Sequence, residues 1–280
     1  LCARQLPWFR LCLARGDVGL RNSLAGTEAV VTGAGRGLGR GVALALAADG
    51  ARVWVCDRTT EELDETAAAI EQAGGQVQIL RFDLTEIAAC HEAITEVKTK
   101  AVHLQVLVNA AAVLKEAEVA KTSSEDWTST LAINLTAPFV LTQGFLPSML
   151  EKGGSVINVS SRAGIAPFRG EAAYCASKYG LEALTKCLAL EFDTLPLSVN
   201  TITPGLHIKP TGLTDKQTVE ATPKQQQQWA DPLELAPAFT FLARLTGEVQ
   251  GLRFNGERLS AALNEEGVNS VLARINELSE

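Results

Sequence analysis

Short apolar runs rich in β-branched residues alternate with longer helical segments from residue 28 onward, and this alternation constrains the fold more than any other feature. Such runs predict strands, with a helix-length segment between each and the next, at 28–32, 51–57, 76–83, 104–109, 155–160 and 197–203. Parallel strands joined by helical crossovers form one sheet that is covered on both faces. The sequence therefore predicts an α/β fold, a doubly wound parallel sheet with helices on both faces.

No linker or shift in composition divides the 280 residues, so we expect a single domain over residues 25–260. Residues 1–24 form an N-terminal extension of uncertain origin that carries four arginines and only one acid. An organellar targeting segment and a start that is not native both remain open for it. Residues 261–280 form a C-terminal helical tail with an amphipathic pattern, which we expect to serve in packing or in a subunit contact.

Charge and cysteine usage exclude several classes of function. The net charge is −7, from 32 acidic and 25 basic residues, and no long basic run is present, which argues against a nucleic-acid partner. No apolar run reaches the ~18 residues that a membrane span needs. The six cysteines are scattered without a C-x-x-C pair, so we expect no metal site, and free thiols in a reducing, cytoplasmic compartment.

A glycine-rich turn follows the first predicted strand, in "T-G-A-G-R-G-L-G" at 32–39. Gly33, Gly37 and Gly39 are spaced G-x-x-x-G-x-G, close to the common dinucleotide fingerprint without matching it. Glycines there permit positive φ and let the backbone approach a pyrophosphate at a helix N-terminus. We therefore expect this turn, with Arg36 and Leu38, to bind a dinucleotide.

The residue that ends the second strand bears on the choice of coenzyme. Asp57 can accept hydrogen bonds from both ribose hydroxyls and repels a 2′-phosphate, which favours NAD over NADP. Arg36 and Arg58 favour NADP, because either can pair with a 2′-phosphate, and we weigh Asp57 more heavily. Asp83 closes the third strand, where binding of the adenine amino group and helix capping are equal alternatives.

The ordered set of motifs resembles the short-chain dehydrogenase/reductase family in its single-domain, Rossmann-type form. The set comprises the glycine-rich turn, Asp57, "D-L" at 83–84, "L-V-N-A-A" at 107–111, Asn134, "V-S-S" at 159–161, "Y-C-A-S-K" at 174–178 and "P-G" at 204–205. The resemblance runs from about residue 25 to residue 259 and includes a last strand within 245–256. A Y-x-x-x-K motif alone is weak evidence for this family, because it occurs often by chance. The whole set of motifs in this order is specific to the family.

The resemblance implies a catalytic group of four residues. Tyr174 is the expected proton donor or acceptor. Lys178 lies one helical turn further on the same face, and its ammonium is expected to lower the pKa of the tyrosine and to bind the nicotinamide ribose. Ser161 matches the serine that orients the substrate carbonyl, and Asn134 matches the helix asparagine that holds a water in a proton relay.

The resemblance also implies cofactor contacts and subunit pairing. The glycine-rich turn, Asp57, Tyr174 and Lys178 are expected to contact the cofactor. Further expected cofactor contacts are Asp83, Leu84, Asn109, Ala110, Pro204 and Gly205. The "V-N-A-A" segment at 108–111 departs from the family's Asn-Asn-Ala-Gly, and Lys209 stands where a threonine is usual. Segment 206–230 is the expected substrate lid. The helices at 125–150 and 172–194 resemble those that pair subunits, which implies a homodimer or homotetramer.

Two functions follow from these residues. The first is an oxidoreductase that interconverts a small-molecule secondary alcohol and a ketone by hydride transfer with NAD, using Tyr174 as acid and base. The second is a non-catalytic dinucleotide-binding or regulatory protein on the same scaffold, which the altered "V-N-A-A" segment favours and the intact group of four residues opposes.

Overall fold

The computed structural model describes residues 20–205, 208, 229–247 and 249–280 of the chain. The strands are β1 (Glu28–Thr32), β2 (Arg52–Asp57), β3 (Gln76–Arg81), β4 (Leu104–Asn109), β5 (Gly154–Val159), β6 (Leu197–Thr203) and β7 (Arg253–Asn255). The helices are α1 (Gly37–Ala48), α2 (Thr60–Gln72), α3 (Ile87–Lys100), α4 (Ser124–Leu131), α5 (Ala137–Lys152), α6 (Ala172–Glu191), α9 (Ala236–Arg244), α10 (Gly256–Glu266), α11 (Val268–Ala273) and α12 (Ile275–Leu278).

The strands form one seven-stranded sheet in the order β3-β2-β1-β4-β5-β6-β7, and every pairing is parallel. The α/β prediction of a doubly wound parallel sheet is confirmed. From β1 the chain builds outward through β2 and β3, then returns to place β4 on the other side of β1. The loops that follow β1 and β4 therefore diverge, and this is where doubly wound sheets bind ligands.

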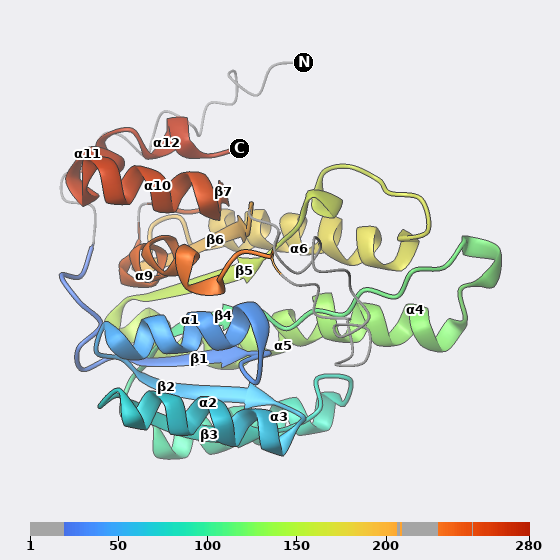
Figure 1. Cartoon of the computed structure of the whole chain (residues 1–280), viewed down its shortest axis with the longest axis horizontal. Coiled ribbons are helices and arrows are strands. Elements are labelled where there is room, and N and C mark those ends of the chain that lie inside the picture. The colour runs from blue at the N-terminus through green and yellow to red at the C-terminus, as the bar shows by residue number, and fades with distance from the viewer. Residues whose placement is uncertain (1–19, 206–207, 209–228, 248) are drawn as a thin grey trace.

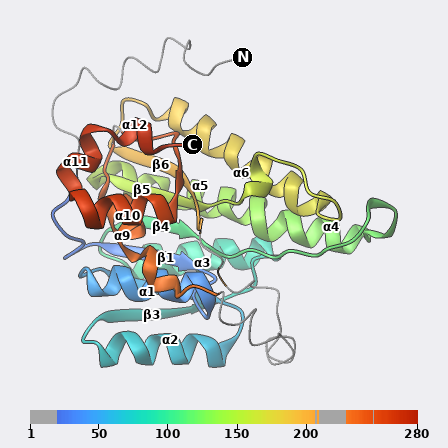
Figure 2. The same cartoon turned by 45° about the horizontal axis from the view of Figure 1, so that its top comes forward.

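Alternate residues of each strand enter two separate cores. In β1, Val31 packs with α1, α9 and α10, whereas its neighbour Val30 packs with α3 and α5. Because side chains of a strand point alternately to its two faces, near-continuous apolar runs are what a sheet covered on both faces requires. Figures 1 and 2 show the helices on either side of the sheet.

The longest helical segment carries the chain beyond the carboxyl ends of the strands. Helix α4 runs through the π-helical segment η4 (Ala132–Thr136) into α5. In Figure 1 the strand arrowheads point toward the side on which α4 and part of α6 project. Residues of these helices therefore lie beside the strand ends, where the predicted functional residues also stand.

The tail packs on the core that includes α1 and α9. Val271, Ile275 and Leu278 are buried there, and Leu263 is partly buried against it. Helix α10 begins at Gly256 and so crosses the expected boundary between residues 260 and 261. The backbone N–H of Glu280 donates to the Arg253 carbonyl, which fixes the last residue to β7.

None of the helices in the described part of the chain is long and apolar enough to cross a membrane.

Candidate active site

The glycine-rich turn brings the end of β1 and the start of α1 into close contact. Gly33 and Gly37 have φ values of +67° and +54°, in the left-handed region that favours glycine. A Cβ atom at Gly39 would overlap the carbonyl oxygen of Gly33, so the helix can approach the loop only because position 39 has no side chain. The start of α1 has no side-chain cap and no acid in its first turn, so its backbone N–H groups remain available to an anion.

Side chains from two neighbouring elements fix this loop. The Asp57 carboxylate accepts hydrogen bonds from the backbone N–H of Gly35 at 3.3 Å and of Arg58 at 2.7 Å. The Thr66 hydroxyl, from α2, donates to the carbonyl oxygens of Ala34 and Gly35 at 3.0 and 3.2 Å. The loop is therefore shaped before any ligand binds, which lowers the entropic cost of binding.

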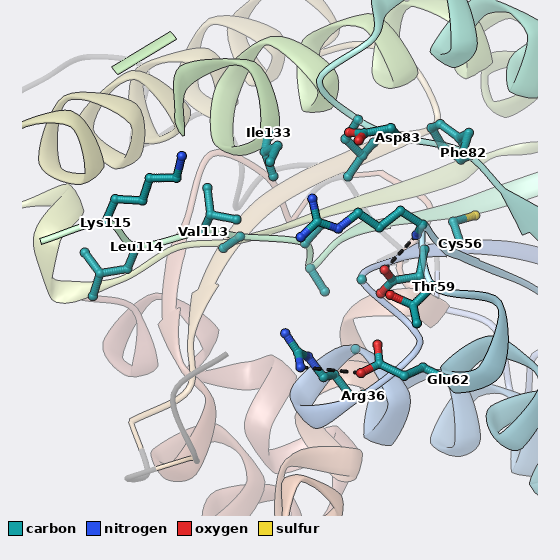
Figure 3. A pocket seen from close by; sticks show the side chains of 18 residues that line it. Arg36, Cys56, Thr59, Glu62, Phe82, Asp83, Val113, Leu114, Lys115 and Ile133 are labelled. Carbon is teal, nitrogen blue, oxygen red and sulfur yellow. Dashed lines mark hydrogen bonds and ion pairs between the residues drawn. The ribbon is translucent and has the colours of Figure 1, made fainter. Parts of the chain in front are cut away.

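A cavity of about 500 Å³ runs from the glycine-rich turn, past the end of β2, to the loop after β4 (Figure 3). Its volume falls in the range of small-molecule and cofactor sites. The predicted cofactor residues that line it are Gly33, Arg36, Gly39, Asp57, Asp83, Leu84 and Ala110. The structure thus brings together residues that are far apart in the sequence.

Charges of both signs surround the end of the cavity that lies beside Asp57. Glu62 lines it and forms an ion pair with Arg36 at 3.4 Å, as Figure 3 shows. Arg58 lines the same end. Two carboxylates and two guanidinium groups therefore line this end of the cavity. These donors and acceptors, together with the glycine-rich turn, fit a dinucleotide.

Asp83 does not cap α3, whose N-cap residue is Glu86, but it holds the turn before that helix and lines the cavity. One carboxylate oxygen accepts from the backbone N–H and the hydroxyl of Thr85, at 2.8 and 2.9 Å, in the turn before α3. The residue also lines the cavity, opposite Arg36 and Glu62 in Figure 3. Asp83 therefore shapes the turn and remains able to contact a ligand.

Tyr174 and Lys178 lie near the start of α6, and Ser161 lies in the loop after β5. The ammonium nitrogen of Lys178 is 5.7 Å from the centre of the Tyr174 ring. Tyr174 is half-buried, and its side chain forms a hydrogen bond with that of Ser161. The Ser161 Oγ also accepts from the backbone N–H of Ala163 at 3.2 Å, which caps the short 3-10 helix η5 (Arg162–Gly164).

The expected direction of the Tyr174 pKa shift is wrong for this structure. Burial raises the pKa of the Tyr174 phenol above its ordinary value, and the hydrogen bond with Ser161 offsets this only partly. The Lys178 ammonium is directed elsewhere, because it donates to the carbonyl oxygen of Val159 at 2.7 Å. Tyr174 is therefore protonated at neutral pH and able to donate a proton.

Lys178 is fully buried among helix α6 and the end of β5. Desolvation lowers the pKa of its ammonium from 10.5 to about 8, although the nearby Glu182 carboxylate acts in the opposite direction. A lysine with such a pKa changes its charge near neutral pH, as perturbed groups at functional sites often do.

Asn134 lies in the π-helical segment η4 and has no exposed surface. Its side chain exchanges two hydrogen bonds with the backbone of Val113, each 2.9 Å long, and donates to the Ser177 hydroxyl at 3.1 Å. Ser177 in turn donates to the carbonyl oxygen of Tyr174 at 2.7 Å. Asn134 thus connects the loop after β4 to the helix that carries Tyr174 and Lys178.

Other predicted cofactor residues do not line the cavity. Asn109 donates across the sheet to Asn158 at 2.8 Å, whereas its neighbour Ala110, which does line the cavity, donates its backbone N–H to the Thr32 hydroxyl at 3.1 Å. Gly205 has a φ of +77°, and a Cβ atom there would overlap the Asn255 side chain. The remaining predicted cofactor residues outside the lining are Gly37, Leu38, Tyr174, Lys178 and Pro204. Lys209 and most of the expected lid, 206–207 and 209–228, lie outside the described residues.

Several residues of the cavity escaped the sequence prediction. These are Cys56, Thr59, Glu62, Phe82, Ala111, Ala112, Val113, Leu114, Lys115 and Ile133. An acid in the first turn of the helix that follows Asp57 was the available signal for Glu62. No comparable signal marked 111–115, because an irregular loop has no periodicity to read.

No group of three or more histidine, cysteine or acidic side chains that could hold a metal ion occurs within the described ranges.

Comparison with known proteins decides the family. Residues 27–221 match the family model described as short chain dehydrogenase. The chain belongs to the short-chain dehydrogenase family. It is 34% identical to the 2,5-dichloro-2,5-cyclohexadiene-1,4-diol dehydrogenase of Sphingobium indicum, over 80% of this chain and 91% of the relative. It is 35% identical to the D-threitol dehydrogenase of Mycolicibacterium smegmatis, over 79% and 86%.

A solved structure supports the same assignment. The chain is 29% identical to a protein of Beutenbergia cavernae that is described as an NAD(P)-dependent gluconate 5-dehydrogenase with bound NADP. The TM-score is 0.75, and the match covers 87% of this chain and 99% of that one. The chain is therefore an oxidoreductase that interconverts an alcohol and a ketone on a small molecule, with a nicotinamide dinucleotide as cofactor. The comparisons give no support to the non-catalytic alternative.

The lowered pKa of Lys178 makes a prediction about stability. Between the folded pKa of about 8 and the ordinary value of 10.5, the unfolded chain binds more protons at this residue than the folded chain. We expect wild type to gain about 2 kcal/mol in unfolding free energy relative to Lys178→Met as the pH rises from about 7.5 to about 9.5. Urea denaturation of both proteins across this pH range measures the difference in unfolding free energy.

The exposed Lys186 on the same helix provides the control. Lys186→Met makes the same replacement at a solvent-exposed position and so controls for the loss of a lysine on this helix. A pH-independent difference for Lys178→Met would contradict the lowered pKa.

Proposed function

We propose that the described site reduces a ketone, and oxidises the corresponding secondary alcohol, with Tyr174 as the acid and base. The observation that supports the proposal is the proximity of Ser161, Tyr174 and Lys178. The last two lie on a helix that Asn134 joins to Val113, a residue that lines the cavity. The bound nicotinamide supplies or accepts the hydride at the substrate carbon. The reverse direction uses the same groups with their protonation states exchanged.

Each residue has a distinct task. The Tyr174 phenol, kept protonated by burial, donates its proton to the substrate oxygen as negative charge develops there. The Ser161 hydroxyl, already hydrogen-bonded with Tyr174, binds the same oxygen and holds it in place. We assign to the Lys178 ammonium, 5.7 Å from the centre of the Tyr174 ring, the stabilisation of the phenolate after proton transfer and the binding of ribose hydroxyls. Asn134 holds the helix of Tyr174 against the Val113 loop.

We propose NAD as the preferred coenzyme over NADP. Asp57 is supported at the end of β2 by two backbone N–H groups, which holds its carboxylate beside the cavity. Glu62 adds a second negative charge there and pairs with Arg36, one of the two cations that could attract a 2′-phosphate. The carboxylates therefore oppose a 2′-phosphate and accept from ribose hydroxyls.

The two relatives named above act on a cyclic diol and on threitol, according to their names. We propose that the substrate of this chain is also a small secondary alcohol with several hydroxyl groups, or the matching ketone. Cyclic diols, linear polyols and sugar acids form the first substrate panel, with a 3-oxoacyl thioester and a hydroxysteroid as the alternatives.

Exposed apolar side chains support a homodimer or homotetramer. Trp127 and Phe139 lie on the α4–α5 segment, and Tyr179 and Leu190 lie on α6; 41% to 58% of each is exposed. Large apolar groups gathered on neighbouring helices are typical of a protein interface. We also propose a cytoplasmic location, which the free thiols of Cys56, Cys90, Cys175 and Cys187 support.

Substitution of the phenol tests the acid and base assignment. We expect Tyr174→Phe to lower kcat at least ~100-fold, because the proton donor is removed while the hydride geometry is preserved. The dissociation constant for NADH, measured by fluorescence titration, should remain within about twofold, since the phenol contributes little to binding.

The second tyrosine of the chain is a matched control. Tyr179 lies on the same helix with an exposed ring, so Tyr179→Phe should retain wild-type kcat. Retained turnover in Tyr174→Phe would overturn the assignment. NADH binding without turnover of any compound by wild type would favour the non-catalytic alternative instead.

Removal of one negative charge tests the coenzyme preference. We expect wild type to have a higher kcat/KM with NADH than with NADPH, and Asp57→Asn to reduce that ratio by on the order of tenfold, because a 2′-phosphate is then less strongly repelled. Steady-state assays with both coenzymes measure it. A preference for NADPH in wild type would mean that Arg36 or Arg58 decides the specificity.

A further inference from the structure

A buried arginine lies behind the catalytic serine. Arg253, in β7, is 6% exposed, and its guanidinium forms an ion pair with Glu182. It also donates to the Ser160 hydroxyl at 3.3 Å and to the carbonyl oxygen of Ser161 at 3.1 Å. A second carboxylate, from Glu280, accepts from its Nε at 3.1 Å. Arginine is almost never buried unless it is paired, and here its donors are distributed over three separate segments.

Glu182 connects this arginine to the helix that carries the acid and base. It is buried on α6, four residues after Lys178, and therefore on the same helical face. Its second carboxylate oxygen accepts from the Thr201 hydroxyl of β6 at 2.9 Å. The pair thus joins α6 to the last two strands of the sheet.

The loop after β5 is held at three successive residues. Lys178 donates to the carbonyl oxygen of Val159, and Arg253 contacts Ser160 and Ser161. Directly beyond them, a Cβ atom at Gly164 would lie 2.8 Å from the Ser160 Oγ and 3.2 Å from the Lys178 carbonyl oxygen. The loop after β5 and helix α6 are therefore packed closely. The Arg253–Glu182 pair contacts both of them, because Arg253 binds the loop and Glu182 belongs to the helix.

We propose that Arg253 is a positioning residue, which together with Glu182 sets the distance between Ser161 on its loop and Tyr174 on α6. The inference rests on the proposed function, because it assigns Ser161 and Tyr174 a common substrate oxygen. Arg253 acts through the Ser161 backbone, and the hydroxyl and the phenol are the groups that act on the substrate. A displacement of about 1 Å between such groups is sufficient to lower the rate roughly 100-fold.

Stability alone is a weak reason for this arrangement. A buried ion pair is often no more stabilising than apolar residues of the same size, because both charges must be desolvated. Removing only one partner leaves a buried unpaired charge and destabilises the fold strongly. A test of positioning must therefore separate the loss of Ser160 and Ser161 contacts from the effect of an unpaired Glu182.

The experiment compares Arg253→Met with the double variant Glu182→Gln/Arg253→Met, using the ketone on which wild type is most active. In Arg253→Met we expect kcat to fall roughly 10- to 100-fold, with the NADH dissociation constant within about twofold of wild type. The double variant has no unpaired carboxylate, so its melting temperature should recover most of the loss. Its kcat should stay low, because neither variant restores the contacts to Ser160 and Ser161.

Two further variants complete the design. Arg253→Lys keeps the charge and loses the branched set of donors, so its kcat should lie between those of wild type and Arg253→Met. Arg244→Met removes another partly buried ion pair, with Asp49, that joins the end of α1 to α9 away from the serine loop. It should lower the melting temperature and leave kcat unchanged.

The outcomes separate this inference from the proposed function. Wild-type kcat in Arg253→Met, or a double variant that recovers kcat together with stability, would overturn the positioning role and leave the proposed function intact. Should Arg253→Met not fold, Arg253→Lys and the double variant decide by the same criteria. No turnover of any ketone by wild type would overturn the proposed function and this inference with it.

Discussion

The parallel arrangement of all seven strands is the constraint on which the rest of the structure depends. Because every strand runs the same way, residues that follow β1, β2, β4 and β5 emerge at one edge of the sheet. The order of the strands then separates the loops after β1 and β4, and the cavity opens between them. Helix α4 and part of α6 project past this edge (Figure 1). Asn134 lies in the segment η4 that directly follows α4, and Tyr174 lies near the start of α6.

Electrostatics at this edge divides the site into two parts. Around Asp57, the charged groups line the cavity and Arg36 is paired with Glu62, an arrangement that can recognise a polar ribose. Around Lys178, the groups are buried, so desolvation governs their pKa values: that of Tyr174 is raised and that of Lys178 is lowered to about 8. In the proposed function, proton transfer belongs to the buried groups around Lys178, and cofactor recognition belongs to the accessible groups around Asp57. The Arg253–Glu182 pair adjoins these buried groups, and both of its charges are almost fully buried.

Most of the fold followed from the sequence, because strands buried on both faces read as short apolar runs and glycines mark the first turn. The residues that meet at strand ends, such as Gly33 and Asp57, could be placed for the same reason. The sequence did not indicate the direction of the Tyr174 pKa shift, because that direction depends first on how deeply the phenol is buried. Nor did it indicate Arg253 and Glu182, since their pairing joins positions 71 residues apart. The amphipathic pattern of the tail predicted its packing side, while its division into α10, α11 and α12 follows from Gly267 and the turn at Arg274.

The central claim is that the glycine-rich turn binds the pyrophosphate of a nicotinamide dinucleotide by close backbone approach. The most direct measurement is the NADH dissociation constant of Gly39→Ala, with Gly180→Ala as the control, because an added Cβ at Gly180 meets the flexible tip of Leu135 and one at Gly39 meets backbone. We expect Gly39→Ala to weaken binding at least about tenfold, since α1 must move away from the loop. Gly180→Ala should bind NADH as wild type does. Equal binding by Gly39→Ala and wild type would contradict the claim.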